Sequence, residues 1–388
     1  MTDTAPVDNL PAFTRKPDLA SRRLGSGVVA ANDELFAERE NLIKPDEPVY
    51  HPSTFGHKGQ VYDGWETRRR REPGVDWAMV RLGAAGVVSG LVVDTAYFTG
   101  NYPPEVSVDG TGVEGYPSPA ELLHADWFPL VERSPVAGDA RNHFEVPSDR
   151  RVTHVRLTMH PDGGVARLRV HGDVVADPRL LSAASLDLAA LENGGSVVGC
   201  SNMFYSSPTN LISPGETRSM GEGWETARRR DDGNDYVEFA LAGPGSIHLA
   251  ELDTRYFVGN APGWARLTGT DARTRDPGDP DAWFELLPRQ RLQPDTRHRL
   301  VLTGTEEVSH VRMDVYPDGG MARVRFWGAL SSHAREAIAL RWFDSLPDSH
   351  LRQVLAADAR CSDAEVSEAL RRRGSGSLPR AVSALLPS

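Results

Sequence analysis

The stretch THVRLTMHPDGGVARLRVHG at residues 153–172 recurs as SHVRMDVYPDGGMARVRFWG at residues 309–328. In the first copy, Val155, Leu157 and Met159 alternate with polar residues, which is the two-residue period of a β-strand, and the alternation resumes after the Pro-Asp-Gly-Gly segment. Proline with a fixed φ and glycines free to take positive φ suit a chain reversal. We therefore predict that a β-hairpin closes each copy.

Further blocks recur in the same order, so a whole domain is duplicated. GWET occurs at residues 64–67 and 223–226, and an Asp-Thr pair followed by Tyr-Phe occurs at residues 94–98 and 253–257. Across Pro45–Gly64 the offset between the copies falls from 169 to 159 residues, so the first copy carries an insertion. We expect this insertion to form a surface loop, where length changes are tolerated.

Short β-rich runs separated by glycine and proline favour an all-β fold made of two tandem β-sandwich domains. We place these domains at residues 18–172 and 187–328. Apolar residues at helical spacing then predict a helical C-terminal tail at residues 331–388. Within it, Ser362 followed by Glu365 is a capping-box pattern that starts a helix.

The composition excludes several classes of protein. Of 388 residues, 39% are hydrophobic and 25% are charged, which is typical of a globular protein, and the net charge of −11 argues against nucleic-acid binding. Two cysteines, Cys200 and Cys361, provide no disulfide framework, and no stretch is typical of a signal peptide or a membrane span. We expect a cytoplasmic homo-oligomer that binds neither nucleic acid nor membranes.

Arginines follow the GWET motif in both copies, and matching positions are occupied by Arg69 with Arg228 and by Arg70 with Arg229. We predict that they bind substrate, because a guanidinium donates two parallel hydrogen bonds to a carboxylate. The alternative is structural, with the glutamate of the motif pairing with an arginine across a strand end.

Acidic residues and histidines at matching positions are the candidate catalytic groups. They are Glu66, Asp94 and His154 in the first copy and Glu225, Asp253 and His310 in the second. Each type also has a structural interpretation, because aspartate often caps a turn and a strand histidine is often buried. No histidine spacing is typical of a metal site, and the motifs GxSxG, P-loop and Rossmann glycine fingerprint are absent, so we predict no metal and no cofactor.

Taken together, the repeated blocks resemble the allantoicase family. In the first copy they are NLIKP from Asn41, YDGWETRRRR from Tyr62, YFTGNYPP from Tyr97 and HPDGGVARLRVHG from His160, and in the second GEGWETARRR from Gly221, YFVGNAP from Tyr256 and YPDGGMARVRFWG from Tyr316. The resemblance runs from about residue 18 to residue 328. It implies two jelly-roll sandwiches of the galactose-binding-like kind and hydrolysis of the small molecule allantoate to ureidoglycolate and urea, a step of purine breakdown.

Allantoate carries one carboxylate and two ureido groups, which suggests a role for each candidate. Arg69 or Arg228 would bind the carboxylate, Glu66 and Asp94 or their copies would orient ureido N–H groups and activate water, and His154 would protonate the departing nitrogen. The number and place of the active sites stay open. There could be one site in each copy, one site between the domains, or one working copy beside a copy that serves only as scaffold.

Two other functions stay open beside allantoate hydrolysis. One is a duplicated carbohydrate-binding module without catalysis, since galactose-binding-like sandwiches often bind sugars. The other is a ureidoglycolate-cleaving lyase.

Overall fold

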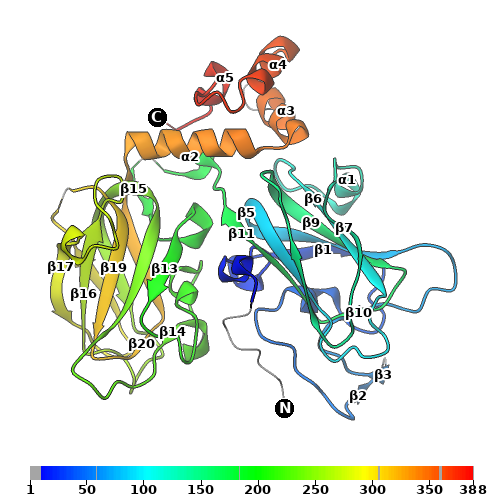
Figure 1. The fold of residues 1–388 in the computed structure, drawn as a ribbon, viewed down its shortest axis with the longest axis horizontal. Coiled ribbons are helices and arrows are strands. Elements are labelled where there is room, and N and C mark those ends of the chain that lie inside the picture. Colours follow the sequence, from blue (N-terminus) through cyan, green and yellow to red (C-terminus); the bar gives the residue numbers. More distant parts are fainter. Residues whose placement is uncertain (1–9, 58, 183, 305, 358–360, 388) are drawn as a thin grey trace. The chain divides into compact units, whose positions relative to one another are not determined.

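The computed structural model describes residues 10–57, 59–182, 184–304, 306–357 and 361–387, and it contains two β-sandwiches followed by helices (Figure 1). The described residues of 1–175 and 342–384 form one compact unit, and those of 176–341 and 385–388 form another. We call the sandwich in the first unit repeat 1 and the sandwich in the second repeat 2. The predicted all-β class, with two jelly-roll sandwiches and a short helical tail, is confirmed.

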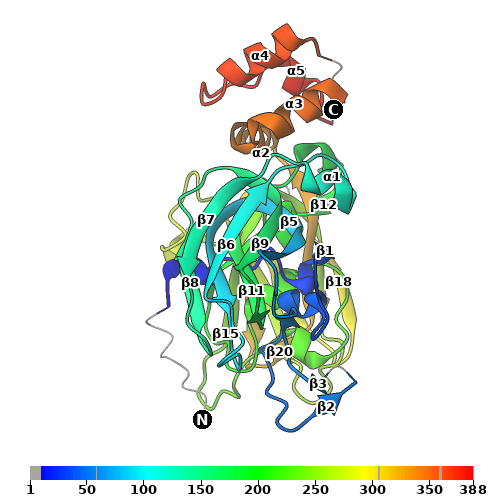
Figure 2. The same ribbon diagram turned by 90° about the vertical axis from the view of Figure 1, so that its right-hand side faces the viewer.

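Repeat 1 contains strands β1 to β11. Its seven-stranded sheet has the order β1-β5-β9-β6-β7, with β8 and β11 also paired to β5, and β4 with β10 and β2 with β3 form two-stranded sheets. Figure 2 shows β7, β6, β9 and β5 next to one another. The strands are β1 Gly27–Ala31, β2 Phe55–Gly56, β3 Gly59–Gln60, β4 Trp65–Glu66, β5 Asp76–Asp94, β6 Glu105–Thr111, β7 Phe128–Pro135, β8 Arg141–Glu145, β9 Arg151–His160, β10 Gly164–Val165 and β11 Arg167–Val174.

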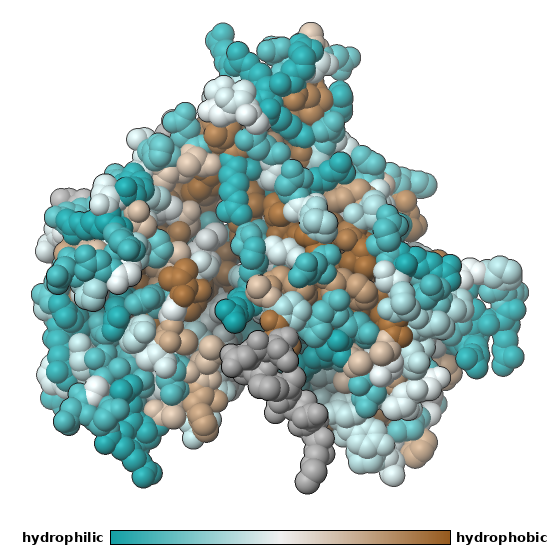
Figure 3. Space-filling view, in the orientation of Figure 1, coloured by the Kyte–Doolittle hydropathy of each residue, from teal (hydrophilic) through white to brown (hydrophobic). Residues whose placement is uncertain are grey.

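Repeat 2 contains strands β12 to β21. Its eight-stranded sheet has the order β12-β21-β15-β19-β16-β17, with β13 and β18 also paired to β15, and β14 pairs with β20 in a two-stranded sheet. On the face shown in Figure 3 it is covered mostly by hydrophilic side chains. The strands are β12 Leu186–Asp187, β13 Ser196–Cys200, β14 Trp224–Glu225, β15 Asp235–Asp253, β16 Trp264–Thr270, β17 Phe284–Arg291, β18 Arg297–Val301, β19 Val308–Tyr316, β20 Gly320–Met321 and β21 Arg323–Leu330.

The longest strand of each repeat, β5 or β15, organises the sandwich. Both are 19 residues long, begin and end with aspartate, and change partners at a register shift near their middle. The first half of β5 pairs with β9, and the second half pairs with β8 and β11. The predicted hairpin is therefore wrong: β9 and β11 each pair with β5, and no pairing joins them in the described chain, because the turn between them crosses from one half of β5 to the other.

The PDGG turn is packed against the phenylalanine ring of the Tyr-Phe motif. A Cβ at Gly164 would lie 2.1 Å from the ring of Phe98, and one at Gly320 would lie 2.0 Å from the ring of Phe257. The preceding glycine also has a φ of +147° in repeat 1, which a side chain disfavours. Two glycines are therefore needed in sequence at this turn.

The tryptophan of each GWET motif is a core residue. Trp65 and Trp224 are fully buried, and their indole N–H groups donate to the carbonyls of Asp33 and Asn202, each at 2.8 Å. Because β4 pairs with β10 and β14 with β20, the motif fastens the PDGG turn to the sandwich.

The helices are α1 Pro119–Leu123, α2 Ser332–Ser345, α3 Asp348–Ala357, α4 Asp363–Arg371 and α5 Arg380–Ser383. The predicted capping box is confirmed, with Ser362 accepting from the backbone N–H of Glu365 at the start of α4. The described tail residues of 342–384 belong to the unit of repeat 1, and His350 contacts the carboxylate of Glu114 at 3.0 Å. Among the described residues, no helix is long and apolar enough to cross a membrane.

Candidate active site

The glutamate of each GWET motif is bound by the asparagine of the YFxGN motif. Glu66 Oε1 accepts a hydrogen bond from Asn101 Nδ2 at 2.7 Å, and Glu225 Oε1 accepts one from Asn260 Nδ2 at 2.6 Å. Burial raises the pKa of Glu66, and the Asn101 hydrogen bond opposes that rise. The GWET and YFxGN motifs, which are separate in the sequence, are therefore in direct contact in both repeats.

The second arginine of each matching pair supports the fold. Arg70 forms an ion pair at 2.6 Å with Asp76, and Arg229 forms one at 2.8 Å with Asp235; both aspartate side chains are only 1% exposed. A buried carboxylate needs such a partner, because an uncompensated charge in the interior is costly.

The first arginine of each pair is solvent-exposed. Neither Arg69 nor Arg228 forms a hydrogen bond or ion pair with the part of the chain that the structure describes. Arg69 lines an open cleft of about 360 Å³ with its neighbours Arg68 and Arg71, while Arg68 is held by Asp33 at 2.6 Å.

The histidines lie far from the motif end of each sandwich. His154 is near the start of β9, six residues before His160, which places them about 20 Å apart along the strand. Its Nδ1 contacts the Thr153 hydroxyl at 2.9 Å, and burial lowers its pKa to about 4. His310 has the same arrangement with Ser309, and burial lowers its pKa as well. The structure does not bring either histidine together with the predicted acids.

The last aspartate of β5 and of β15 lies at the strand end where β8 and β11, or β18 and β21, also meet. Asp94 accepts from the backbone N–H of Ala96 at 2.8 Å, and Asp253 accepts from that of Arg255 at 2.9 Å. Burial raises the pKa of Asp94, whose nearest cation is Arg141 Nε at 3.6 Å. The turn-capping role expected for these aspartates is therefore present in both repeats.

In repeat 2 this strand end forms a polar cavity of about 200 Å³, which we call the strand-end cavity. Its volume suits a small polar molecule, since drug-sized ligands occupy pockets of roughly 300 to 1,000 Å³. The lining residues are Gly215, Glu216, Glu251, Asp253, Arg255, Arg297, Arg323, Arg325 and Trp327.

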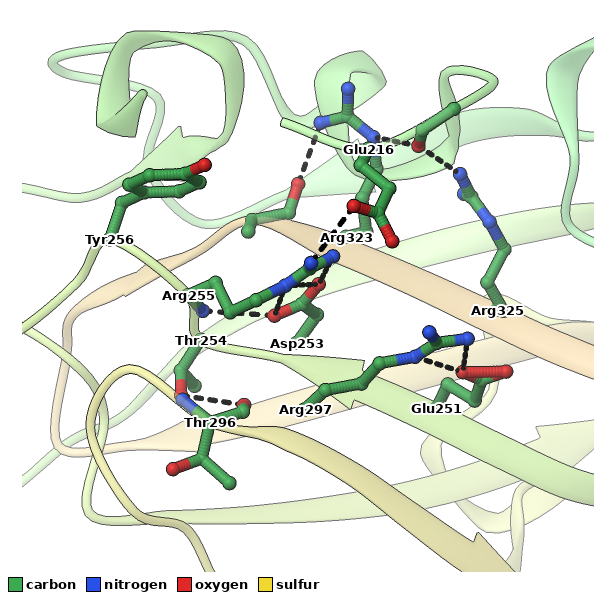
Figure 4. A network of polar contacts seen from close by, with 12 residues as sticks. Glu216, Glu251, Asp253, Thr254, Arg255, Tyr256, Thr296, Arg297, Arg323 and Arg325 are labelled. Carbon is green, nitrogen blue, oxygen red and sulfur yellow. Dashed lines mark hydrogen bonds and ion pairs between the residues drawn. The ribbon is translucent and has the colours of Figure 1, made fainter. Parts of the chain in front are cut away.

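Ion pairs fix the guanidinium groups of this cavity (Figure 4). Arg255 donates two hydrogen bonds to Asp253 Oδ2, from Nη2 at 2.6 Å and from Nε at 2.9 Å. Arg297 grips Glu251 with Nε at 2.5 Å and also with Nη2, and the Trp327 indole N–H donates to the other oxygen of Glu251 at 2.7 Å. These contacts hold the side chains in place before any ligand binds.

One carboxylate of the cavity is exposed to solvent. Glu216 has a 66% exposed side chain, and Oε2 contacts Arg255 Nη1 at 3.1 Å. Glu251 and Asp253 are instead each 5% exposed, and each forms an ion pair with an arginine. The cavity therefore combines arginines held by ion pairs, two buried carboxylates that already have partners, and one solvent-exposed carboxylate.

The corresponding positions in repeat 1 differ at four of the lining residues, one of which is Gly215, matched by Asp46. Glu251, Arg255 and Trp327 are matched by Val92, Ala96 and His171. The arginines of β18 and β21 have counterparts, so both repeats share three cations at this strand end.

Sequence reasoning found Asp253 but missed the arginines and the tryptophan around it. The signal was available, because Arg323, Arg325 and Trp327 alternate with buried apolar residues along β21 and so point to one face. The same alternation predicts the strand but does not indicate that its polar face lines a cavity. In the described chain, no three His, Cys, Asp or Glu side chains are grouped as metal ligands would be.

The model of the "Allantoicase repeat" family matches residues 17–175 and 186–331, so it covers both sandwiches and stops where the helical tail begins. The chain belongs to the allantoicase family. It is 60% identical over 321 residues to the "Probable allantoicase" of Nocardia farcinica, an alignment covering 82% of this chain and 95% of that protein. It is 52% identical to the "Probable allantoicase" of Streptomyces coelicolor, covering 85% and 89% of the two chains.

Solved structures of this family share the fold. The crystal structure of allantoicase from Saccharomyces cerevisiae is 33% identical, with a TM-score of 0.70, and the match covers 81% of this chain and 94% of that one.

Proposed function

We propose that this protein hydrolyses allantoate to ureidoglycolate and urea. The observation that carries the proposal is the match to the allantoicase family over both repeats, with 60% identity to a relative of which 95% is covered. The arginine-rich strand ends fit the same substrate, because its carboxylate needs a forked donor and its ureido groups need carboxylate and carbonyl acceptors.

The reaction places simple demands on the site. The oxygen of a water molecule bonds to the central carbon of allantoate while the bond from that carbon to one ureido nitrogen breaks. The water loses a proton, and the leaving nitrogen gains one, so urea departs neutral. The site must therefore fix the carboxylate and one ureido group and present an acceptor for the proton of water.

We propose that one of the two strand ends, that of Asp94 or that of Asp253, is where the substrate binds. The predicted site at Arg69 or Arg228 stays a prediction, supported by the exposure of both guanidinium groups. A role for Glu66 or Glu225 also stays a prediction, with each carboxylate already held by an asparagine. His154 is a poor proton donor near neutral pH, because its lowered pKa keeps the ring neutral.

The test is incubation of the purified protein with allantoate, with urea and ureidoglycolate measured in the presence and absence of a chelator. We expect both products in equal amounts, with activity retained on chelation. Urea no higher than in the no-enzyme control would contradict the proposal, and loss on chelation that a divalent ion restores would contradict only its metal-free part. A lyase would instead release urea from ureidoglycolate when that compound is supplied alone.

The cytoplasmic location and the homo-oligomer remain proposals. Both cysteines are free thiols, which fits a reducing compartment. Cell fractionation tests the first proposal, and light scattering of the purified protein tests the second. Recovery outside the cytoplasm, or a monomer mass of 42.4 kDa at all concentrations, would contradict them in turn.

A further inference from the structure

We propose that repeat 2 is the copy that binds the substrate, and that Arg255 and Glu251 determine this choice. The inference rests on the proposed function and deepens it by assigning the working copy. It starts from three side chains that the repeats do not share: Glu251, Arg255 and Trp327 in repeat 2.

The first step concerns the arginine at the start of β8 or β18, which faces the last aspartate of the long strand in each repeat. This arginine is Arg141 in repeat 1 and Arg297 in repeat 2. In repeat 1 the loop glutamate Glu47 forms an ion pair with Arg141. A carboxylate of the protein therefore already occupies the guanidinium that a substrate carboxylate would need.

In repeat 2 the matching loop glutamate takes another partner. Glu216 contacts Arg255 at 3.1 Å instead of Arg297. Repeat 1 has alanine at the position of Arg255, so it lacks the cation that binds the loop glutamate in repeat 2. By binding Glu216, Arg255 leaves the Arg297 guanidinium free of the loop carboxylate.

The second step concerns the orientation of Arg297. Glu251 binds its Nε and Nη2 edge and is itself fixed by the Trp327 indole at 2.7 Å. Nη1 of Arg297 forms no hydrogen bond with the described residues, and the side chain is 48% exposed. The outer edge of this guanidinium, formed by Nη1 and Nη2, is therefore held ready to bind a carboxylate with two parallel hydrogen bonds. Glu251 acts as a positioning residue, and valine at its counterpart in repeat 1 cannot do so.

The experiment measures binding and turnover in matched variants. The binding probe is N-carbamoylglycine, which carries one carboxylate and one ureido group, and its affinity is measured by calorimetry. We expect R255A to weaken probe binding and to lower kcat/KM for allantoate about tenfold to a hundredfold, because Glu216 then pairs with Arg297 and replaces its charge-assisted contact with the substrate carboxylate. R255A recreates the alanine with which repeat 1 folds, so its melting temperature should stay close to that of the wild type.

The control variant is E47Q in repeat 1, which removes the carboxylate from Arg141 without touching repeat 2. We expect its turnover to match the wild type. Unchanged binding and turnover in R255A would overturn the assignment, as would a loss in E47Q equal to that in R255A. If the wild type released no urea, the proposed function would fail, while probe binding that R255A weakens would still locate an anion site in repeat 2.

The positioning role of Glu251 needs a separate readout. E251Q keeps an acceptor for the Trp327 indole but weakens the grip on Arg297, so we expect KM to rise more than kcat falls. A fall in melting temperature with unchanged KM would show a purely structural role and contradict the positioning.

Discussion

The two repeats are built alike at the turn and differently at the strand end. At the turn, the same two glycines, a buried tryptophan and a glutamate–asparagine hydrogen bond occur in both. At the strand end, repeat 2 adds an arginine, a glutamate and a tryptophan where repeat 1 has Ala96, Val92 and His171. The difference teaches that the motifs shared by the copies mainly hold the fold, whereas the unshared residues equip one copy for a ligand.

The largest expected effect tests the shared turn. G164A and G320A should each destabilise their repeat by about 3 kcal/mol, because the new methyl group overlaps a buried phenylalanine ring. Thermal unfolding monitored by circular dichroism measures the loss. If one repeat tolerated its alanine while the other unfolded, the turns would not be equivalent.

Removal of the helical tail should separate the repeats by stability. A chain ending at Arg341 keeps β21 and the part of α2 that belongs to the unit of repeat 2, but it loses the described part of 342–384, which forms one compact unit with repeat 1. We expect repeat 1 to melt at a lower temperature and repeat 2 to melt as before, since Trp342 and Phe343 are fully buried and their packing is lost. Calorimetry resolves the two transitions. Equal shifts of both transitions would contradict the assignment of the tail to the first unit.

The strand histidines should affect acid stability rather than catalysis. Burial lowers the pKa of His154 to about 4, below its unfolded value of about 6.5, so the unfolded chain binds the extra proton first as pH falls. The stabilisation from the neutral ring is therefore complete above about pH 6.5 and is lost between that pH and about pH 4. H154Q should show a smaller loss of melting temperature across this window, and a kinetic pH profile changed by H154Q would contradict a structural role.

The smallest effect is expected at the exposed arginines. If the strand end binds the substrate, R69K and R228K should each change kcat/KM for allantoate less than about threefold. A loss of tenfold or more in one of them, with an unchanged melting temperature, would instead support the sequence-based prediction that this arginine clamps the carboxylate.

The sequence was sufficient to predict the fold because duplication doubled each signal. Repeated alternation, the paired GWET blocks and Ser362 with Glu365 each correspond to an element of the structure. The hairpin was mispredicted because a PDGG turn between two alternating runs does not reveal that both strands pair with a third, β5 or β15.

The candidate site was harder to predict, for two physical reasons. The cavity is assembled from residues far apart in the chain, from Glu216 in a loop to Trp327 on β21, which no spacing rule connects. The repeated motifs also point to residues that match between the copies, whereas Glu251 and Arg255 occur in one copy only.

The most direct test of the difference between the repeats is kcat/KM for allantoate in the matched variants R297K and R141K. Lysine keeps the charge but loses the fork that grips a carboxylate. We predict a loss of about tenfold to a hundredfold in R297K and little change in R141K, with both melting temperatures near that of the wild type. A loss confined to R141K, or equal losses in both variants, would contradict the assignment of the substrate to repeat 2.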